Sequence, residues 1–434
     1  MHLSDSQLLQ DCSNTRRYAS GSQPFGIPRM SKIELPAPPN YPNARITIFA
    51  GFCACLVSIG LARFAYTPLI PPLIQAHWFA ASDVVYLGAA NLVGYLIGAL
   101  LGHPLARRLS NKSTLRLMMV VVTLSFFACG FPISFGWFFV WRLLSGIAGG
   151  TVMVLVAATV LPHVHPSSRG LASGAIFLGI GLGIAGSGTI IPPLLELGLQ
   201  QTWFGLGIIS LILLAASWFG WPIPTNHSVA PAHFVTPAPV RNSGVYLVYA
   251  QYGLMAIGLV PAMMFLVDYV ARGIGADAHA GAIVWIMYGL GAIIGPVTYG
   301  FVADKLGAQT GIRLVLTAQA IALAFIPFTT SLPVLAFLSV IIGSFPPGIV
   351  PLTLARVHEL LPSHHQQQIA WSRATASFAS AQALAGFAYS ALFDASGGYH
   401  AVLFMFACGA IVLALLLDQG SRLVSDATPC RQAG

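Results

Sequence analysis

The sequence predicts an all-α membrane protein whose twelve transmembrane helices form two six-helix bundles. Three observations support this fold class. Of the 434 residues, 56% are hydrophobic and only 7% are charged, whereas soluble domains carry about 25% charged residues, so most of the surface must face lipid. Long apolar stretches recur along the chain. A polar segment rich in proline divides these stretches into two equal sets.

Twelve apolar stretches approach the roughly 20 residues that a helix needs to cross a bilayer. They are rich in Gly, Ala, Leu, Ile and Phe. Sustained alternation of apolar and polar residues, which would indicate the ~10-residue strands of a membrane barrel, does not occur in them. We expect the helices at residues 46–70, 82–101, 114–133, 137–161, 170–194, 203–221, 245–267, 280–302, 312–331, 334–354, 370–393 and 400–417.

The segment between the sixth and seventh stretches reads PIPTNHSVAPAHFVTPAPVRNSG. Its prolines and small polar residues predict a non-helical linker. The similar endings VLPHVHPSSRG and ELLPSHHQQQ of the fourth and tenth stretches indicate duplicated halves, with a substrate site between them. We expect a mobile cytoplasmic tail at 1–44, bundles at 45–221 and 245–418, a cytoplasmic linker at 222–244 and a cytoplasmic tail at 419–434.

Lys and Arg gather on one side of the predicted topology. Both tails and the connections after the even-numbered spans hold most of them, among them Arg16, Arg107, Lys112, Arg169, Lys305, Arg356 and Arg422. Because basic loops stay in the cytoplasm, we expect a multi-pass protein of the bacterial inner membrane with both termini cytoplasmic. The net charge of +8 follows from this topology, and its scattered placement argues against nucleic-acid binding.

The strongest local motif is YGFVADKLGAQ, residues 299–309, at the predicted cytoplasmic end of the eighth span. Gly300 and Gly307 permit close helix approach and a tight turn. Asp304 can face the positive end of a neighbouring helix, and Lys305 lies at the headgroup level. The motif resembles the loop signature of the major facilitator superfamily, Gly-x-Leu-Ala-Asp-Arg-x-Gly. This resemblance implies the major facilitator fold and a role of these four residues in gating the cytoplasmic side.

The first-half counterpart of this motif is GHPLARRLSNKS, residues 102–113. It keeps Gly102 and a basic pair but has Ala106 where the aspartate is expected. The two halves are therefore not expected to latch in the same way.

The fourth span carries WRLLSGIAGG, residues 141–150. Arg142, Gly146 and Gly149 or Gly150 share one helix face, and glycines let a neighbouring helix approach closely. The motif resembles the superfamily's fourth-span signature Arg-x-x-x-Gly-x-Gly, which is associated with proton-coupled transport. In the alternative interpretation, Arg142 reaches the membrane interface and the glycines serve only packing.

The first span places Arg63 within the apolar run GLARFAYTPLIPP, residues 60–72. A charge at the bilayer centre costs about 2.5–3.5 kcal/mol or more, so it normally faces an internal cavity and has a partner. Because acidic residues are missing from the middle of the predicted spans, Arg63 must bind helix carbonyls, Tyr hydroxyls, water or an incoming anion. Pro68, Pro71 and Pro72 remove backbone donors and are expected to bend this span. Arg63 therefore either binds the negative part of a substrate or plays a structural role.

The same run, with YGLMAIGLVPAMMFLVDYVARGIG at 252–275, resembles the YbfB/YjiJ-type bacterial branch of the superfamily over residues 45–420. Buried amides need partners, and aromatic rings with a polar tip suit a pocket of mixed polarity. The candidate substrate-binding residues are Arg63, Tyr66, Asn91, Tyr95, Arg142, Tyr252, Trp285, Tyr288 and Gln382. Asp268, near the outer end of the seventh span, is the candidate proton carrier.

These observations predict a secondary transporter that moves a small anionic or zwitterionic metabolite or drug by alternating access. Its expected partners are the solute, the lipid bilayer and, by the resemblance, protons, and we expect it to act as a monomer. The sequence lacks a Walker-type phosphate loop and metal-ligand spacings, so we expect neither cofactor nor metal and no enzyme activity. The alternatives are a membrane sensor on the same scaffold that does not transport, or a membrane-embedded enzyme.

Overall fold

The computed structural model describes residues 44–165, 168–222 and 243–426 of the chain. Within these ranges the chain forms helices and turns and contains no strand. The predicted amino-terminal tail at 1–44 lies almost wholly outside the described residues, as does most of the predicted linker at 222–244. The predicted carboxy-terminal tail at 419–434 is described only to Asp426, where helix α14 ends.

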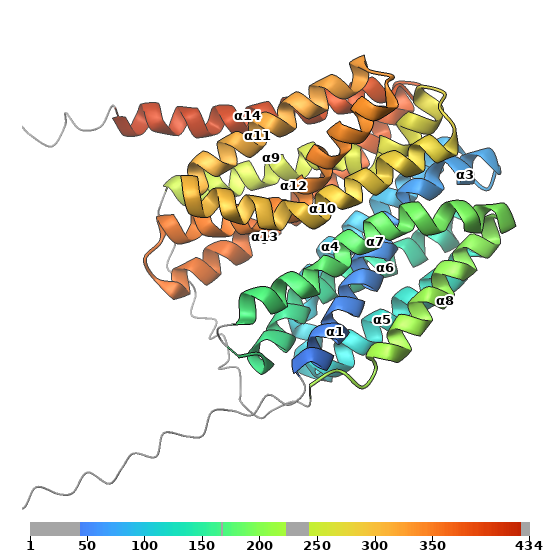
Figure 1. The fold of residues 1–434 in the computed structure, drawn as a ribbon, viewed down its shortest axis with the longest axis horizontal. Helices are drawn as coiled ribbons and strands as arrows, with labels where there is room; N and C mark the ends of the chain where they lie inside the picture. Colours follow the sequence, from blue (N-terminus) through green and yellow to red (C-terminus); the bar gives the residue numbers. More distant parts are fainter. Residues whose placement is uncertain (1–43, 166–167, 223–242, 427–434) are drawn as a thin grey trace, which may run out of the picture. The chain divides into compact units, whose positions relative to one another are not determined.

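The first half of the described chain runs from α1 to α8 (Figure 1). The first predicted span consists of five short helical segments, and the next five spans are long helices. In chain order they are α1 (Ala44–Cys55), the π-helix η2 (Leu56–Leu61), α2 (Ala62–Phe64), the 3₁₀ turn η3 (Thr67–Leu69), α3 (Ile70–Gln75), α4 (Ala81–Leu109), α5 (Asn111–Cys129), α6 (Phe135–Val160) with η4 (Leu161–His163), α7 (Arg169–Leu197) and α8 (Leu199–Ser217).

The second half repeats this plan. Its elements are α9 (Ser243–Asp268) with the π-helix η6 (Tyr269–Gly273), α10 (Ala278–Leu306), α11 (Ala308–Phe325) with η7 (Ile326–Phe328), α12 (Leu332–Leu360), α13 (His364–Ala395) and α14 (His400–Asp426). In the described ranges, eleven helical spans are long and apolar enough to cross a membrane. The predicted span that is missing from this set is the eleventh, α13, which is 32 residues long but rich in Ser and Gln. It packs against α4 and α9, and this internal position accommodates its polarity.

Glycines bring α4 and α6 into backbone contact. A methyl group at Gly94 would collide with the carbonyl oxygen of Leu143, one at Gly98 with that of Ile147, and one at Gly146 with that of Asn91. The second half contains the same arrangement between α10 and α12. There Gly291 faces the carbonyl of Val340, Gly295 that of Ser344, and Gly343 that of Tyr288. The residues of the α4–α6 contact and those of the α10–α12 contact differ by the same residue-number offset throughout. This regularity supports the predicted duplication of the two halves.

This offset also revises the comparison of the two loop motifs. Both α4 and α10 end in a residue with left-handed backbone, Ser110 with φ 76° and Gly307 with φ 79°. Aligning these two positions places Arg107, rather than the predicted Ala106, opposite Asp304. The first half therefore has a cation at the position of the motif's aspartate. Ser110 adopts a conformation that favours glycine, and its hydroxyl accepts a hydrogen bond from the amide of Ser113.

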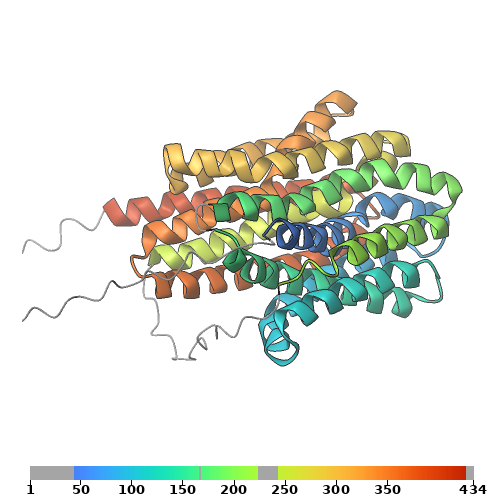
Figure 2. The same ribbon diagram turned by 60° about the horizontal axis from the view of Figure 1, so that its bottom comes forward.

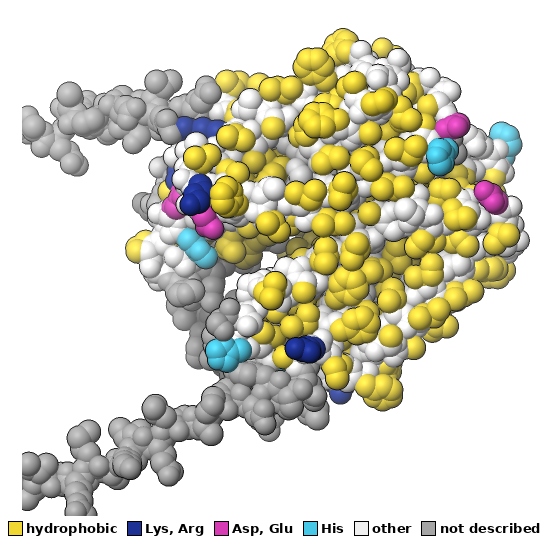
Figure 3. Space-filling view, viewed as in Figure 1, with side chains coloured by type: hydrophobic (Ala, Val, Ile, Leu, Met, Phe, Trp, Pro, Cys, Tyr) yellow, Lys and Arg dark blue, Asp and Glu magenta, His cyan; other side chains and the backbone are white. Residues whose placement is uncertain are grey.

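The two halves meet along two long pairs of helices, α4 with α13 and α7 with α10. In Figures 1 and 2, α7 in green runs alongside α10 in yellow-orange. Two hydrogen bonds cross this contact: Thr67 in η3 donates to the carbonyl of Met263 at 2.6 Å, and Trp285 Nε1 donates to Ser187 Oγ at 3.0 Å. Figure 3 shows the halves parted at the opposite end, where a cleft opens on the side on which Lys and Arg gather.

We expect Gly98→Val and Gly343→Val to destabilise the protein strongly, because each new side chain meets a neighbouring backbone oxygen. Overpacking of this kind costs about 1–3 kcal/mol even where side chains can yield, and a helix backbone yields less. The measurement is the melting temperature in detergent. Gly409→Val is the matched control, since Gly409 has no atom within 4 Å of an added methyl group. Equal melting of the Gly98→Val and Gly409→Val proteins would contradict this packing.

Candidate functional site

The first span is built to place Arg63 at the contact between the halves. Gly60 packs directly on the backbone of α7 at Gly179 and Gly183, so the π-helix η2 lies unusually close to α7. Past Arg63, the helix breaks at the 3₁₀ turn that contains Pro68, as the prolines predicted. Single π-helical turns occur often at functional sites, and here one directly precedes Arg63.

Arg63 has no acidic partner among the described residues. Between residues 57 and 71 every residue is buried except Arg63, which is partly exposed. Its guanidinium carbon lies 4.8 Å from the ring centroid of Tyr95 and 5.5 Å from that of Phe64. The Nε of Arg63 is buried and has no hydrogen-bond partner. The structure thus leaves this cation contacted by aromatic rings but without a neutralising group.

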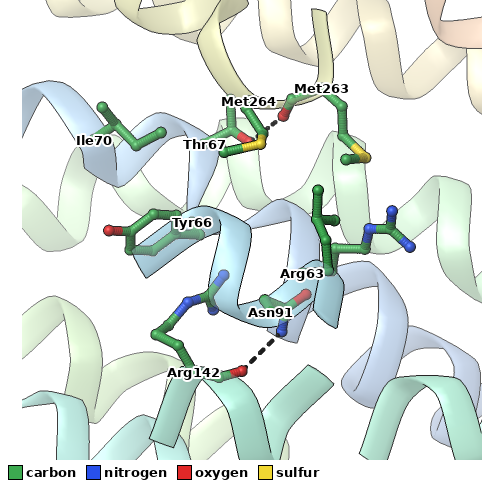
Figure 4. Close-up of a pocket in the computed structure, with 10 residues that line it drawn as sticks. Arg63, Tyr66, Thr67, Ile70, Asn91, Arg142, Met263 and Met264 are labelled. Atoms are coloured by element: carbon green, nitrogen blue, oxygen red, sulfur yellow. Dashed lines mark hydrogen bonds between the residues drawn. The ribbon is translucent and has the colours of Figure 1, made fainter. Parts of the chain in front are cut away.

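Arg142 is bonded in a different way. It is only 4% exposed, so it does not reach the membrane interface. Its Nη1 donates to the carbonyl of Ala62 at 2.7 Å and its Nε to that of Leu87 at 3.5 Å, while the guanidinium lies 4.1 Å from the ring centroid of Tyr66. Figure 4 shows the side chain of Arg142 rising toward Tyr66, while that of Arg63 extends in a different direction. Arg142 therefore ties the segment that carries Arg63 to α4 and α6.

Tyr66 and Asn91 complete this hydrogen-bonded network. Tyr66 donates to the carbonyl of Val84 at 2.6 Å. Asn91 donates to Ser145 Oγ at 3.0 Å and to the carbonyl of Arg142 at 3.3 Å. These interactions use the donors of three residues that were predicted to bind substrate, so the geometry favours a supporting role for them.

A small cavity lies beside this network. Its lining comes from the first half and from α9 of the second half (Figure 4). The lining residues are Arg63, Tyr66, Thr67, Ile70, Gly88, Asn91, Leu92, Arg142, Met263 and Met264. The hydrogen bond between Thr67 and Met263 crosses it from one half to the other.

The second half contributes aromatic side chains around Arg63. Trp285 and Tyr288 stack with ring centroids 4.8 Å apart, and Trp285 lies 6.3 Å from Phe64. The hydroxyl of Tyr288 is buried and has no hydrogen-bond partner among the described residues. Phe64 was not among the predicted site residues, because a lone phenylalanine beside an arginine carries no distinctive sequence signal.

Two further predicted residues extend this group. Tyr252 packs on Phe378 at 4.5 Å between ring centroids. Gln382 is 2% exposed, and its Oε1 has no hydrogen-bond partner. On the same helix α13, Gly386 faces Ala89 and Leu92 of α4. Gln382 stands one turn before Gly386, on the helix that packs against α4.

Asp268 lies away from Arg63, at the end of α9 where the π-helix η6 begins. It is fully buried. Arg272 contacts both carboxylate oxygens at 2.5 and 2.6 Å, and His400 Nε2 lies 2.6 Å from Oδ2. His400 opens α14 and was not predicted as part of the site, because 132 residues separate it from Asp268.

The predicted gating motif lies at the far end of α10. Asp304 and Lys305 are exposed, Gly300 has open space around it, and Gly307 ends the helix. The carboxylate that meets the amino terminus of α11 is that of Glu359, which accepts a hydrogen bond from the amide of Ala308 at 2.8 Å. This contact differs from the one expected for Asp304, and the gating role of the motif stays a prediction.

Two halves that enclose an interior cation and aromatic side chains define a membrane transport protein rather than a receptor for a large ligand. The family described as "Uncharacterised MFS-type transporter YbfB" matches residues 55–419. The chain therefore belongs to the YbfB-type family of the major facilitator superfamily, as the sequence motifs predicted.

Relatives and a solved structure agree with this assignment. The chain is 25% identical to the uncharacterised MFS-type transporter YceJ of Bacillus subtilis (strain 168), over 82% of this chain and 93% of that protein. It is 23% identical to a gallate transporter of Pseudomonas putida, over 60% of this chain and 64% of that protein. A crystal structure of the nucleoside transporter NupG superposes with a TM-score of 0.72 at 13% identity, over 88% of this chain and 99% of that one.

These similarities confirm the predicted fold, with twelve membrane helices in two six-helix bundles. They also show that the protein is a multi-pass membrane transporter of small solutes and not an enzyme.

We expect Arg142→Gln and Arg63→Gln to have opposite effects on stability. Hydrogen bonds from a charged donor contribute about 1.5–3 kcal/mol, so Arg142→Gln, which loses two of them, should melt well below the parent protein in detergent. Arg63→Gln removes a desolvated charge without breaking a hydrogen bond to Nε and should melt at or above the parent temperature. A lower melting temperature for Arg63→Gln than for Arg142→Gln would contradict this division of roles.

Proposed function

We propose that this protein carries a small organic anion or zwitterion across the bacterial inner membrane by alternating access, and that Arg63 binds its negative group. The observation that carries the proposal is the guanidinium of Arg63, which lies between the halves without an acidic partner. Truncating one member of a buried charge pair costs several kcal/mol. An anion that supplies the missing charge would therefore bind selectively at this point.

The cleft in Figure 3 supports alternating access. In this arrangement the halves are apart at the basic end, which is the cytoplasmic end in the proposed topology, with both termini in the cytoplasm. At the other end the helices of the two halves pack on one another, α7 on α10 and α4 on α13. Among the described residues, two hydrogen bonds between neutral groups, from Thr67 and from Trp285, also link the halves, and each contributes about 0.5–1.5 kcal/mol net. The motif with Gly300, Asp304, Lys305 and Gly307 would close the basic end in the other state.

The relatives are consistent with an organic anion. One of them is named a gallate transporter, and gallate carries a carboxylate. The proposed carrier acts as a monomer, because each chain contains both halves and the whole site between them.

We further propose that the transport cycle is coupled to protons through Asp268 and His400. Arg272 favours the charged form of the Asp268 carboxylate, with which it forms a two-point contact. Histidine is the side chain whose charge changes closest to neutral pH, and His400 shares Asp268 Oδ2. A proton taken up or released by this pair would change the contact between α9 and α14.

The test of the substrate proposal is uptake of labelled organic acids, amino acids and neutral solutes into proteoliposomes. We expect the parent protein to take up anionic or zwitterionic solutes, and Arg63→Ala to reduce that uptake more than about tenfold. Arg45→Ala is the control, because Arg45 is an exposed arginine at the start of α1, outside both the site and the loop motifs. Anion uptake that is unchanged in Arg63→Ala protein, or uptake of neutral solutes alone, would exclude the proposed binding role.

The test of proton coupling compares uptake driven by an imposed pH gradient with exchange of solute across the same membrane at equal pH. In His400→Gln and Asp268→Asn proteins we expect the gradient-driven uptake to be lost while exchange persists. Asp394→Asn changes an exposed carboxylate and should behave like the parent. A full response of the His400→Gln protein to the pH gradient would exclude this pair as the proton carrier.

A further inference from the structure

We propose that the transported anion is an aromatic carboxylate whose ring bears a hydroxyl group. This inference rests on the proposed function and narrows its substrate class. It follows from three features of the site: the free edge of Arg63, the aromatic side chains around it, and two buried polar atoms without partners.

The free edge of Arg63 suits a carboxylate. Phe64 and Tyr95 contact the guanidinium with their rings, so hydrogen bonding is left to the nitrogen atoms at its edge. The buried Nε has no partner. A guanidinium edge binds a planar carboxylate through two parallel hydrogen bonds, whereas a neutral solute such as a nucleoside would leave the charge unbalanced.

Aromatic side chains from both halves surround the carboxylate position. Phe64 connects Arg63 to the stacked pair of Trp285 and Tyr288. On the other side, the ring of Tyr95 lies 4.8 Å from the guanidinium carbon. Flat apolar faces of this kind gain most from stacking on another ring, by about 0.5–1.5 kcal/mol beyond the area buried. An aliphatic acid of the same size would gain the burial but not the stacking.

Two partnerless polar atoms lie in the second-half part of the site. The Oε1 of Gln382 and the hydroxyl of Tyr288 are both buried and make no hydrogen bond, although each residue is at most 2% exposed. A buried acceptor without a donor is unfavourable. A hydroxyl on the far side of a carboxylate-bearing ring supplies that donor, and this distinguishes a hydroxylated ring from benzoate.

The experiment measures binding by isothermal titration calorimetry to the full chain in nanodiscs. The four probes are 3,4-dihydroxybenzoate, benzoate, cyclohexanecarboxylate and catechol. We expect the affinity to fall in the order dihydroxybenzoate, benzoate, cyclohexanecarboxylate, with roughly tenfold between the first two. Catechol, which has the hydroxylated ring but no carboxylate, should bind at least tenfold more weakly than dihydroxybenzoate.

The variant Gln382→Leu tests the hydroxyl contact separately. It should weaken dihydroxybenzoate binding about tenfold and leave benzoate binding unchanged, which a merely structural effect would not do. Equal losses for both ligands, or equal binding of cyclohexanecarboxylate and benzoate, would overturn the inference. If aliphatic carboxylates still bind in an Arg63-dependent manner, the proposed function survives while the aromatic class fails. If none of the carboxylates binds, both fail.

Discussion

The guanidinium of Arg63 is a cation at the contact between two helix bundles, and among the described residues it has no ion of opposite sign to balance it. Because lipid surrounds the protein, the charge cannot reach water through the lipid-facing side. The residues on either side of Arg63 are buried by neighbouring helices. The surrounding structure accommodates the charge with the electron-rich faces of two rings. Such contacts contribute about 0.5–2 kcal/mol, which offsets only part of the desolvation. The part of the desolvation cost that is not offset makes Arg63 suited to binding an anion and not to structural support.

Arg142 shows what the chain does when an arginine serves the fold. All the stabilisation of this second buried cation comes from neighbouring backbone and from the ring of Tyr66. One of the carbonyls it binds belongs to Ala62, the residue directly before Arg63. Arg142 thus holds the helix segment in place, and Arg63 presents its charge from that segment. A substitution at either position would reduce transport, but for different physical reasons.

Much of the fold could be predicted from the sequence, because lipid imposes a simple rule on length and polarity. Even α13, too polar for a simple hydropathy criterion, coincides with the stretch predicted at residues 370–393. The bend after Arg63 followed from prolines alone. The partners of the polar residues could not be predicted in the same way. His400 pairs with Asp268 across 132 positions, and Glu359 rather than Asp304 meets the start of α11, because such contacts depend on how helices are rotated against one another. The alignment of Arg107 with Asp304 likewise required the backbone angles of Ser110 and Gly307.

The matching glycine contacts of α4 with α6 and of α10 with α12 have a consequence for the bound solute. Backbones that touch without intervening side chains cannot slide, so each pair moves as one stiff body. Arg63 is fastened to the first body through Arg142, while Tyr288 belongs to the second. A solute that contacts both Arg63 and Tyr288 would therefore connect the α4–α6 pair with the α10–α12 pair. The length and rigidity of the bound solute would then determine how closely the two helix pairs can approach each other. The solute would thus help to set the geometry of the closed state.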